Sequence, residues 1–119
     1  MKPHQNLEAW KKSFSLVKKL YLITANFPKE ERFGLTSQIR RAAVSVPVNI
    51  AEGAGRKSRK EFIHFLSIAM GSLSELDTLI LLSNDLGYIS SSECKDLIFE
   101  LNFIGKLIYG LMKSIGYKN

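Results

Sequence analysis

Apolar residues recur every three or four positions in four segments of this chain, and this spacing predicts four amphipathic helices. The segments cover residues 7–26, 35–53, 59–86 and 91–115, and short polar or glycine-containing stretches separate them. Helices joined by short connections pack against each other in opposite directions. The pattern therefore predicts an all-α fold, an antiparallel up-down-up-down four-helix bundle that forms a single domain over residues 1–119.

The first segment carries one strict three-four stripe, which predicts the seam that faces the rest of the bundle. This stripe consists of Leu7, Trp10, Phe14, Val17, Tyr21 and Thr24, and a second group widens it with Leu16, Leu20, Ile23 and Phe27. Asn6 is positioned to cap the start of this helix. Pro28 predicts its end, because the residue before a proline avoids helical geometry.

The second segment carries two adjacent apolar stripes. One consists of Leu35, Ile39, Ala43, Val46 and Ile50, and the other follows Arg40 through Val44, Pro47 and Ala51. Two interpretations stay open: a deeply buried helix, or an oligomer interface formed by the second stripe. Pro47 removes one helical hydrogen bond. Because the four-residue step continues from Val46 to Ile50, we favour a helix kinked at Pro47 over a helix that ends near Val46 and restarts.

Glycine and serine residues predict the other helix ends. Helix-ending glycines, which tolerate the left-handed conformation, are Gly53, Gly55, Gly87 and Gly116. Capping boxes of the S-x-x-E type predict the starts of the third and fourth helices at Ser58–Glu61 and Ser90–Glu93. Gly71, in the middle of the third helix, predicts a close approach of a neighbouring helix.

Charge is distributed unevenly along the chain, which has a net charge of +6. Residues 6–26 carry a net charge of +3, residues 40–60 carry +5, and residues 61–86 carry −4. A basic surface beside an acidic helix suits an anionic partner, and it equally suits complementary contacts between subunits.

Two groups of cations are the candidate nucleic-acid contacts. The polar face of the first helix contributes Lys11, Lys12, Lys18 and Lys19, and the turn before the third helix contributes Arg56, Lys57, Arg59 and Lys60. The lysine face has two interpretations, a solvated surface or a stripe that contacts phosphates. Binding through phosphates depends strongly on salt and carries little sequence preference.

No catalytic or metal-binding pattern emerges. The two histidines, His4 and His64, are far apart in the sequence and accompany no nucleophile motif. Carboxylate-bridged metal sites in bundles use two Glu-x-x-His pairs, and this chain has one, at Glu61 and His64. The sequence GAGRKS lacks the spacing of a P-loop. We therefore expect a protein that is not an enzyme and has no cofactor or metal.

Cys94 is the single cysteine, so no disulfide can form within the chain, and we expect a reducing, cytoplasmic location. We interpret Cys94 as a small, semi-buried apolar residue. The first residues lack the apolar stretch of a secretory signal, and no uninterrupted apolar run approaches the ~20 residues of a membrane span. We expect no membrane partner.

The stretch FGLTSQIRRAAVSVPVNIAEGAGRKSRKEFIHFLSIAMGSLSELDTLI, residues 33–80, resembles the core of a known family. This is the family of four-helix bundle proteins, or 23S rRNA intervening-sequence proteins, some of which are labelled ribosomal proteins. The AW-K-x₄-L run from Ala9, the Phe27–Pro28 pair and LGYI at Leu86–Ile89 match the same pattern, so the resemblance covers nearly the whole chain. Its most specific part is Ser37–Glu61, where Val48 replaces the serine of many relatives.

The resemblance implies no catalytic residues, and a related retroelement accessory protein is a basic pentamer that binds nucleic acid and a reverse transcriptase. Charge and resemblance together predict a non-catalytic bundle that associates with RNA. The alternative is a protein-interaction or assembly module whose charges serve subunit contacts alone. The surplus of apolar surface predicts a homo-oligomer, a closed ring with head-to-tail contacts. The number five for this ring comes from the resemblance.

Overall fold

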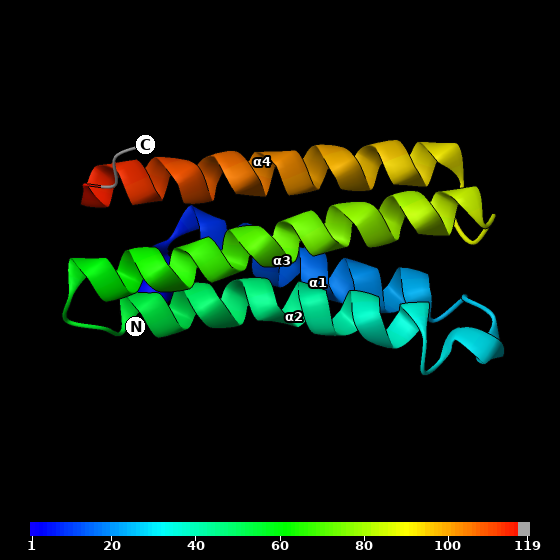
Figure 1. Ribbon diagram of the computed structural model, residues 1–119, viewed down its shortest axis with the longest axis horizontal. Coiled ribbons are helices and arrows are strands. Elements are labelled where there is room, and N and C mark those ends of the chain that lie inside the picture. Colours follow the sequence, from blue (N-terminus) through cyan, green and yellow to red (C-terminus); the bar gives the residue numbers. More distant parts are fainter. Residues whose placement is uncertain (117–119) are drawn as a thin grey trace.

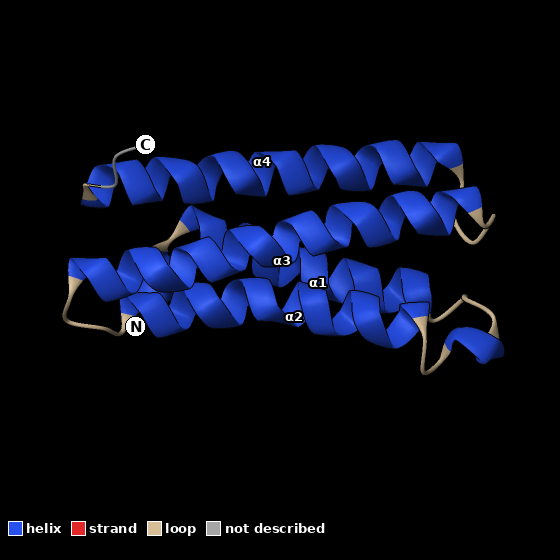
Figure 2. Cartoon of the chain, in the orientation of Figure 1, coloured by secondary structure: helices blue, strands red, loops and turns tan. Residues whose placement is uncertain are grey.

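The computed structural model describes residues 1–116 and confirms the four-helix bundle (Figure 1). Its helices are α1 (Glu8–Thr24), α2 (Leu35–Ala54), α3 (Arg59–Asp85) and α4 (Ser91–Ile115). Short 3-10 helices, η1 (Pro3–Asn6) and η2 (Lys29–Glu31), precede α1 and α2. The described residues include no strand (Figure 2).

The helices surround one core in the order in which they follow one another in the chain. Each helix contacts the next, and α1 also contacts α4 through the smallest of the four helix–helix contacts. The long axis of the molecule measures 43 Å. The rise of about 1.5 Å per residue gives α3 nearly this length, so α3 spans the whole bundle.

α1 is rotated relative to the predicted seam. Phe14 and Tyr21 are 46% and 42% exposed, so two aromatic residues assigned to the seam lie outside the core. The buried stripe of α1 is instead Ala9, Ser13, Leu16, Leu20 and Thr24. Small side chains that bond their own helix can occupy such a stripe: the Ser13 hydroxyl donates to the Trp10 carbonyl (3.0 Å) and the Thr24 hydroxyl to the Leu20 carbonyl (2.7 Å).

The start of α1 also differs from the prediction. Asn6 lies in η1, and the capping position belongs to Leu7, whose side chain makes no capping bond. The backbone N–H of Leu7 instead donates to the His4 carbonyl (3.0 Å). α1 therefore begins from a preceding 3-10 turn.

α2 continues through Pro47, so the interpretation with a break near Val46 is wrong and a kink at Pro47 stays a prediction. Gly53 lies inside α2 and is buried. A Cβ atom at Gly53 would lie 2.8 Å from Cδ1 of Phe62 and 3.2 Å from its carbonyl oxygen. Gly55, which follows the helix, has a φ of −82°. Neither glycine supplies a left-handed turn, and Gly53 serves instead to let α3 approach α2.

The other local signals give mixed results. The Ser90 box is complete, whereas Ser58 accepts from the Glu61 N–H (3.2 Å) and the carboxylate of Glu61 turns towards Arg56. Gly87 and Gly116 have φ values of +80° and +111°, as their helix-ending role predicts. The prediction for Gly71 is wrong, because a Cβ atom there would meet nothing within 4 Å.

α3 is the one described helix that is long and apolar enough to cross a membrane by length and composition, with a mean hydropathy of 1.5 over its most apolar window. Its most deeply buried side chains, Leu66, Leu76 and Ile80, belong to the core of the bundle.

Candidate nucleic-acid interface

The four lysines predicted on α1 are exposed, but two of them have carboxylate partners. The Lys11 ammonium lies 3.6 Å from the Glu8 carboxylate, and the Lys19 ammonium lies 2.9 Å from the carboxylate of Glu100 on α4. Lys18 lies over the Phe14 ring, with 5.5 Å from its ammonium to the ring centroid. Both ion pairs are partly exposed and therefore weak, so they reduce the positive potential of the lysine face without abolishing it.

Arg56 is occupied by contacts within its own corner. Its guanidinium lies 3.1 Å from the Glu52 carboxylate and 3.8 Å from that of Glu61, and its central carbon lies 5.0 Å from the Phe65 ring centroid. These contacts connect the end of α2 to the first turn of α3. Arg56 therefore has a positioning role in the corner.

Lys57, Arg59 and Lys60 remain open to solvent. No carboxylate of residues 1–116 lies within the 4.0 Å ion-pair distance of their side-chain nitrogens. Arg59 and Lys60 are the first two residues of α3. The positive end of the helix dipole disfavours cations there, by roughly 0.3–1 kcal/mol each at an exposed site. The corner thus concentrates positive potential that an anion would relieve.

The bundle places the start of α1 at the same end as this corner (Figure 1). η1, which leads into α1, contacts α2, so Lys11 and Lys12 lie at this end. Lys18 and Lys19 lie about two turns further along α1. The two predicted groups therefore share one end of the molecule only in part.

A groove follows the outer boundary between α1 and α2. Its first part, the apolar groove, has a volume of about 310 Å³ and is lined by Trp10, Phe14, Val17, Lys18, Val44, Pro47, Val48 and Ala51. All three predicted interface residues line it. Val44 is 36% exposed, Ala51 is half-buried and Pro47 is buried within the single chain. Most of the open apolar surface here comes from Val44 and its neighbours Val48 and Phe14.

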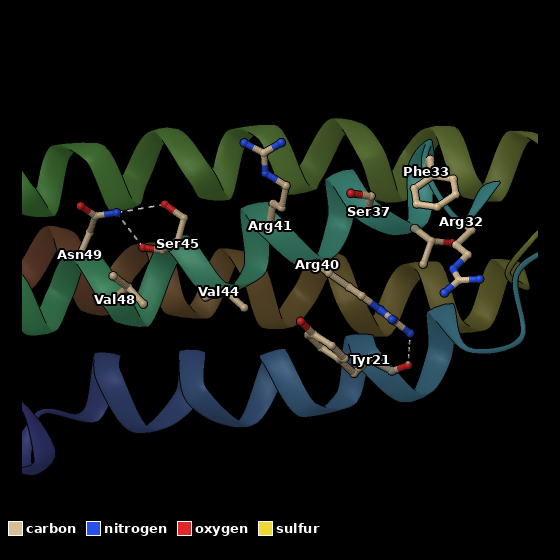
Figure 3. Close-up of a pocket in the computed structure, with 11 residues that line it drawn as sticks. Tyr21, Arg32, Phe33, Ser37, Arg40, Arg41, Val44, Ser45, Val48 and Asn49 are labelled. Atoms are coloured by element: carbon tan, nitrogen blue, oxygen red, sulfur yellow. Dashed lines mark hydrogen bonds between the residues drawn. The ribbon is translucent and has the colours of Figure 1, made fainter.

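The second part, the arginine cleft, has a volume of about 700 Å³ and shares Val44 and Val48 with the apolar groove. Its remaining lining residues are Tyr21, Arg32, Phe33, Thr36, Ser37, Arg40, Arg41, Ser45 and Asn49 (Figure 3). The sequence interpretation assigned none of these residues to a site. A signal was present: Ser37, Arg41, Ser45 and Asn49 recur every four residues and form a polar stripe on α2.

Acid–base chemistry has little support in the described part of the chain. No three residues of the His, Cys, Asp and Glu types gather there in a way that could hold a metal ion. The pKa of Tyr88 is raised, because its hydroxyl donates to the Glu31 carboxylate (2.9 Å). The other Glu31 oxygen accepts from the Leu35 N–H (3.1 Å), so this cluster joins helix ends. Cys94 is buried, more deeply than the semi-buried position predicted for it.

Comparisons with known proteins identify a family and a similar fold. The model of the family described as 23S rRNA-intervening sequence protein matches residues 5–110. A crystal structure from Bacteroides thetaiotaomicron, described as a protein with unknown function from the S23 ribosomal protein family, superimposes with a TM-score of 0.79. It is 25% identical, and the match covers 88% of this chain and 98% of the other. Among curated proteins, none matches the chain. Neither description names a catalytic activity.

Proposed function

The chain belongs to the 23S rRNA-intervening sequence protein family, and from this premise we propose that it is a non-catalytic, RNA-associated four-helix bundle. The family name connects these proteins with ribosomal RNA genes. The proposed contact surface is the corner between α2 and α3, with support from the exposed lysines of α1.

One observation carries the proposal: Lys57, Arg59 and Lys60 are exposed, lack a carboxylate partner among the described residues, and gather at the positive end of α3. Cations at this position weaken the helix, so they are poorly explained as stabilising residues. A phosphate group would bring the missing negative charge, and the helix dipole would add to its attraction.

The remaining predicted cations have graded roles in this proposal. Lys12 and Lys18 have no carboxylate partner among the described residues and extend the positive surface along α1. Lys11 and Lys19 would have to leave Glu8 and Glu100, which reduces their expected contribution. Arg56 connects the end of α2 to the first turn of α3 through its contacts with Glu52 and Glu61.

Filter binding of a structured RNA at two salt concentrations tests the proposal. Replacing Lys57, Arg59 and Lys60 together with alanine should weaken binding and reduce the slope of log K against log salt by about 3, roughly one for each lost phosphate contact. The matched control replaces Lys95, Lys106 and Lys113 of α4, which removes the same charge from another helix. Equal losses in both triple variants would mean that net charge, and not the corner, binds RNA.

A second candidate function, self-assembly, is favoured by the apolar groove. Val44 and Val48 lie in the open beside Phe14, which is 46% exposed. A second copy of the chain that covers this groove would bury the exposed apolar surface. The acidic residues of α3 and the basic corner are unlike surfaces, which suits a head-to-tail ring, and the resemblance suggests five subunits. Sedimentation equilibrium at micromolar concentration tests this, because a monomer mass would exclude the ring.

A further inference from the structure

The arginine cleft contains three arginines and no carboxylate. It lies over the outward face of α2 from Thr36 to Asn49, between the α1 side chain Tyr21 and the α2 side chain Arg41 (Figure 3). Arg40 extends towards α1, whereas Arg41 projects on the α3 side of α2 (Figure 3). Arg41 also lines a neighbouring hollow, together with Glu75 of α3. The charged groups of Arg41 and Glu75 do not form an ion pair.

Arg40 is half-buried, and all its partners are neutral. Its Nε donates to the Thr24 hydroxyl oxygen (2.9 Å), one terminal nitrogen donates to the Tyr21 carbonyl (3.2 Å), and its central carbon lies 4.4 Å from the Tyr21 ring centroid. These contacts fix the guanidinium without neutralising it. A guanidinium has about five N–H donors, and these bonds use two, so donors remain for an anion.

Phe33 lies at the far end of the cleft and is 89% exposed. The Arg32 guanidinium lies over its ring at 5.5 Å from the centroid. The Phe33 ring is therefore not enclosed by the fold, and it is accessible to a ligand in the cleft. Aromatic rings beside arginines are the surfaces on which unpaired bases stack, because every base has a flat π-face.

We propose that the arginine cleft binds an unpaired nucleotide of single-stranded RNA, with its phosphate on Arg40 and its base against Phe33. This inference rests on the proposed function and specifies which form of RNA the surface selects. The cleft volume of about 700 Å³ falls in the range of small-ligand sites and admits a nucleotide. A duplex keeps its bases stacked inside and presents no free base to Phe33.

The cleft and the basic corner can act on one strand. Arg40 and the end of α2 are fourteen residues apart, or about 20 Å along the helix. A stacked strand advances about 3.4 Å per nucleotide, so on the order of six nucleotides connect the two sites. An unpaired segment of about twelve nucleotides therefore reaches both, which defines the probe for the test.

The experiment measures fluorescence polarisation of a labelled single strand of about twelve nucleotides and of the blunt duplex of the same sequence. The proteins are the full chain, Phe33→Ala, Arg40→Gln and the control Phe99→Ala. Phe99 is 73% exposed on α4, so both phenylalanine substitutions remove an exposed aromatic ring without opening the core. Circular dichroism melting verifies that each variant is folded.

Phe33→Ala should weaken binding of the single strand about tenfold, the loss expected for one stacked base, and leave the duplex affinity unchanged. Arg40→Gln, which removes the charge proposed to hold the phosphate, should reduce the salt slope by about one for the single strand alone. Phe99→Ala should change neither affinity.

An unchanged single-strand affinity in Phe33→Ala, or equal losses for single strand and duplex, would overturn the cleft assignment while RNA binding by the corner stands. If the unaltered protein binds neither probe, the proposed function and this inference fall together. A loss in Phe99→Ala equal to that in Phe33→Ala would also overturn the inference, because any exposed aromatic ring would then serve.

Discussion

α2 meets its two neighbours in different ways. Its edge towards α3, the closed edge, brings the two backbones together: Gly53 admits Phe62, and the Ser72 hydroxyl donates to the Ser45 hydroxyl oxygen (2.8 Å) beside a polar hollow. Its edge towards α1 is open on the outer side, where bulky residues such as Phe14 and Val44 hold a groove apart. The same helix thus packs tightly on one side and leaves a surface on the other.

Side-chain size at the contact positions produces this difference. Glycine and serine allow two helix backbones to approach, and the close contact contributes packing energy to the fold. Large residues on both sides of a boundary keep the helices apart at the surface, so part of each apolar side chain stays open. The closed edge of α2 therefore serves stability, and the open edge is available for partners.

The largest expected effect comes from Gly53→Val, which fills the closed edge. The added side chain collides with Phe62 and Phe65, whose Cβ atom lies 3.0 Å from the position of a new Cβ. We expect the free energy of unfolding to fall by about 3 kcal/mol, the upper range for overpacking. Chemical denaturation measures the change.

Gly71→Ala is the matched control for that substitution, since a Cβ atom there meets nothing within 4 Å. It should raise the free energy of unfolding by up to about 1 kcal/mol through helix propensity. Destabilisation by Gly71→Ala of the same size as that by Gly53→Val would show that the closed edge has no special status.

Val44→Asp tests the open edge. The carboxylate would lie in the apolar groove, where a second copy would have to desolvate it. We expect self-association to weaken about a hundredfold, or about 2.7 kcal/mol, with the fold of the single chain retained. Sedimentation equilibrium reports the mass. Leu82→Asp, at a 44% exposed position of α3, is the control and should leave association unchanged.

Thr24→Val tests the contact that connects α1 to α2 beneath the cleft. The substitution removes the oxygen that accepts from Arg40 Nε and keeps the shape of the side chain. We expect a loss of about 1 kcal/mol in the free energy of unfolding, since a half-buried donor loses its partner. Thr78→Val is the control and should have little effect. Thr78 lies at an exposed position of α3, and its hydroxyl donates to the Ser74 carbonyl of the same helix.

The smallest expected effect is a loss of stability at alkaline pH. It comes from Tyr88, at the end of the bundle where α2 begins. The hydrogen bond to Glu31 raises the pKa of Tyr88 above its ordinary value of 10.0. The folded chain therefore holds this proton more tightly than the unfolded chain. The stabilisation is complete below pH 10.0 and is lost as pH rises through the raised pKa.

Thermal melts between neutral and strongly alkaline pH measure this loss. Tyr88→Phe should be less stable at neutral pH and should lose less on alkalinisation. Tyr21→Phe should keep the alkaline loss of the unaltered protein. A Tyr88→Phe variant with the full alkaline loss would assign the pH dependence to other groups.

Several features of the fold could be predicted from the sequence because they depend on neighbouring residues. The Ser90–Glu93 box begins α4, and Gly87 and Gly116 end α3 and α4. The apolar stripe of α4 also forms its buried face, from Cys94 to Met112. The capping box and the two glycines act within one or two helical turns, so they depend little on distant residues.

The candidate site depends on contacts with residues far away in the sequence, and a local pattern does not reveal these contacts. Glu100 is 81 residues from Lys19 in sequence, and its carboxylate pairs with a lysine that the α1 pattern leaves open. The rotation of α1 also depends on contacts with other helices. The spacing within α1 is helical for both of its adjacent apolar stripes, so this spacing does not decide which stripe faces the core. Ser13 and Thr24 bond their own helix and can face the core, which leaves Phe14 and Tyr21 outside.

The sequence by itself determined where α4 begins and where α3 and α4 end, since hydrogen bonds of caps and turns are local. Tertiary packing decided which face of α1 is buried, which cations are paired, and that Gly53 lets two helices approach instead of ending one. The physical reason is that burial and pairing depend on the fit between side chains far apart in the chain. That fit exists only once the four helices have come together.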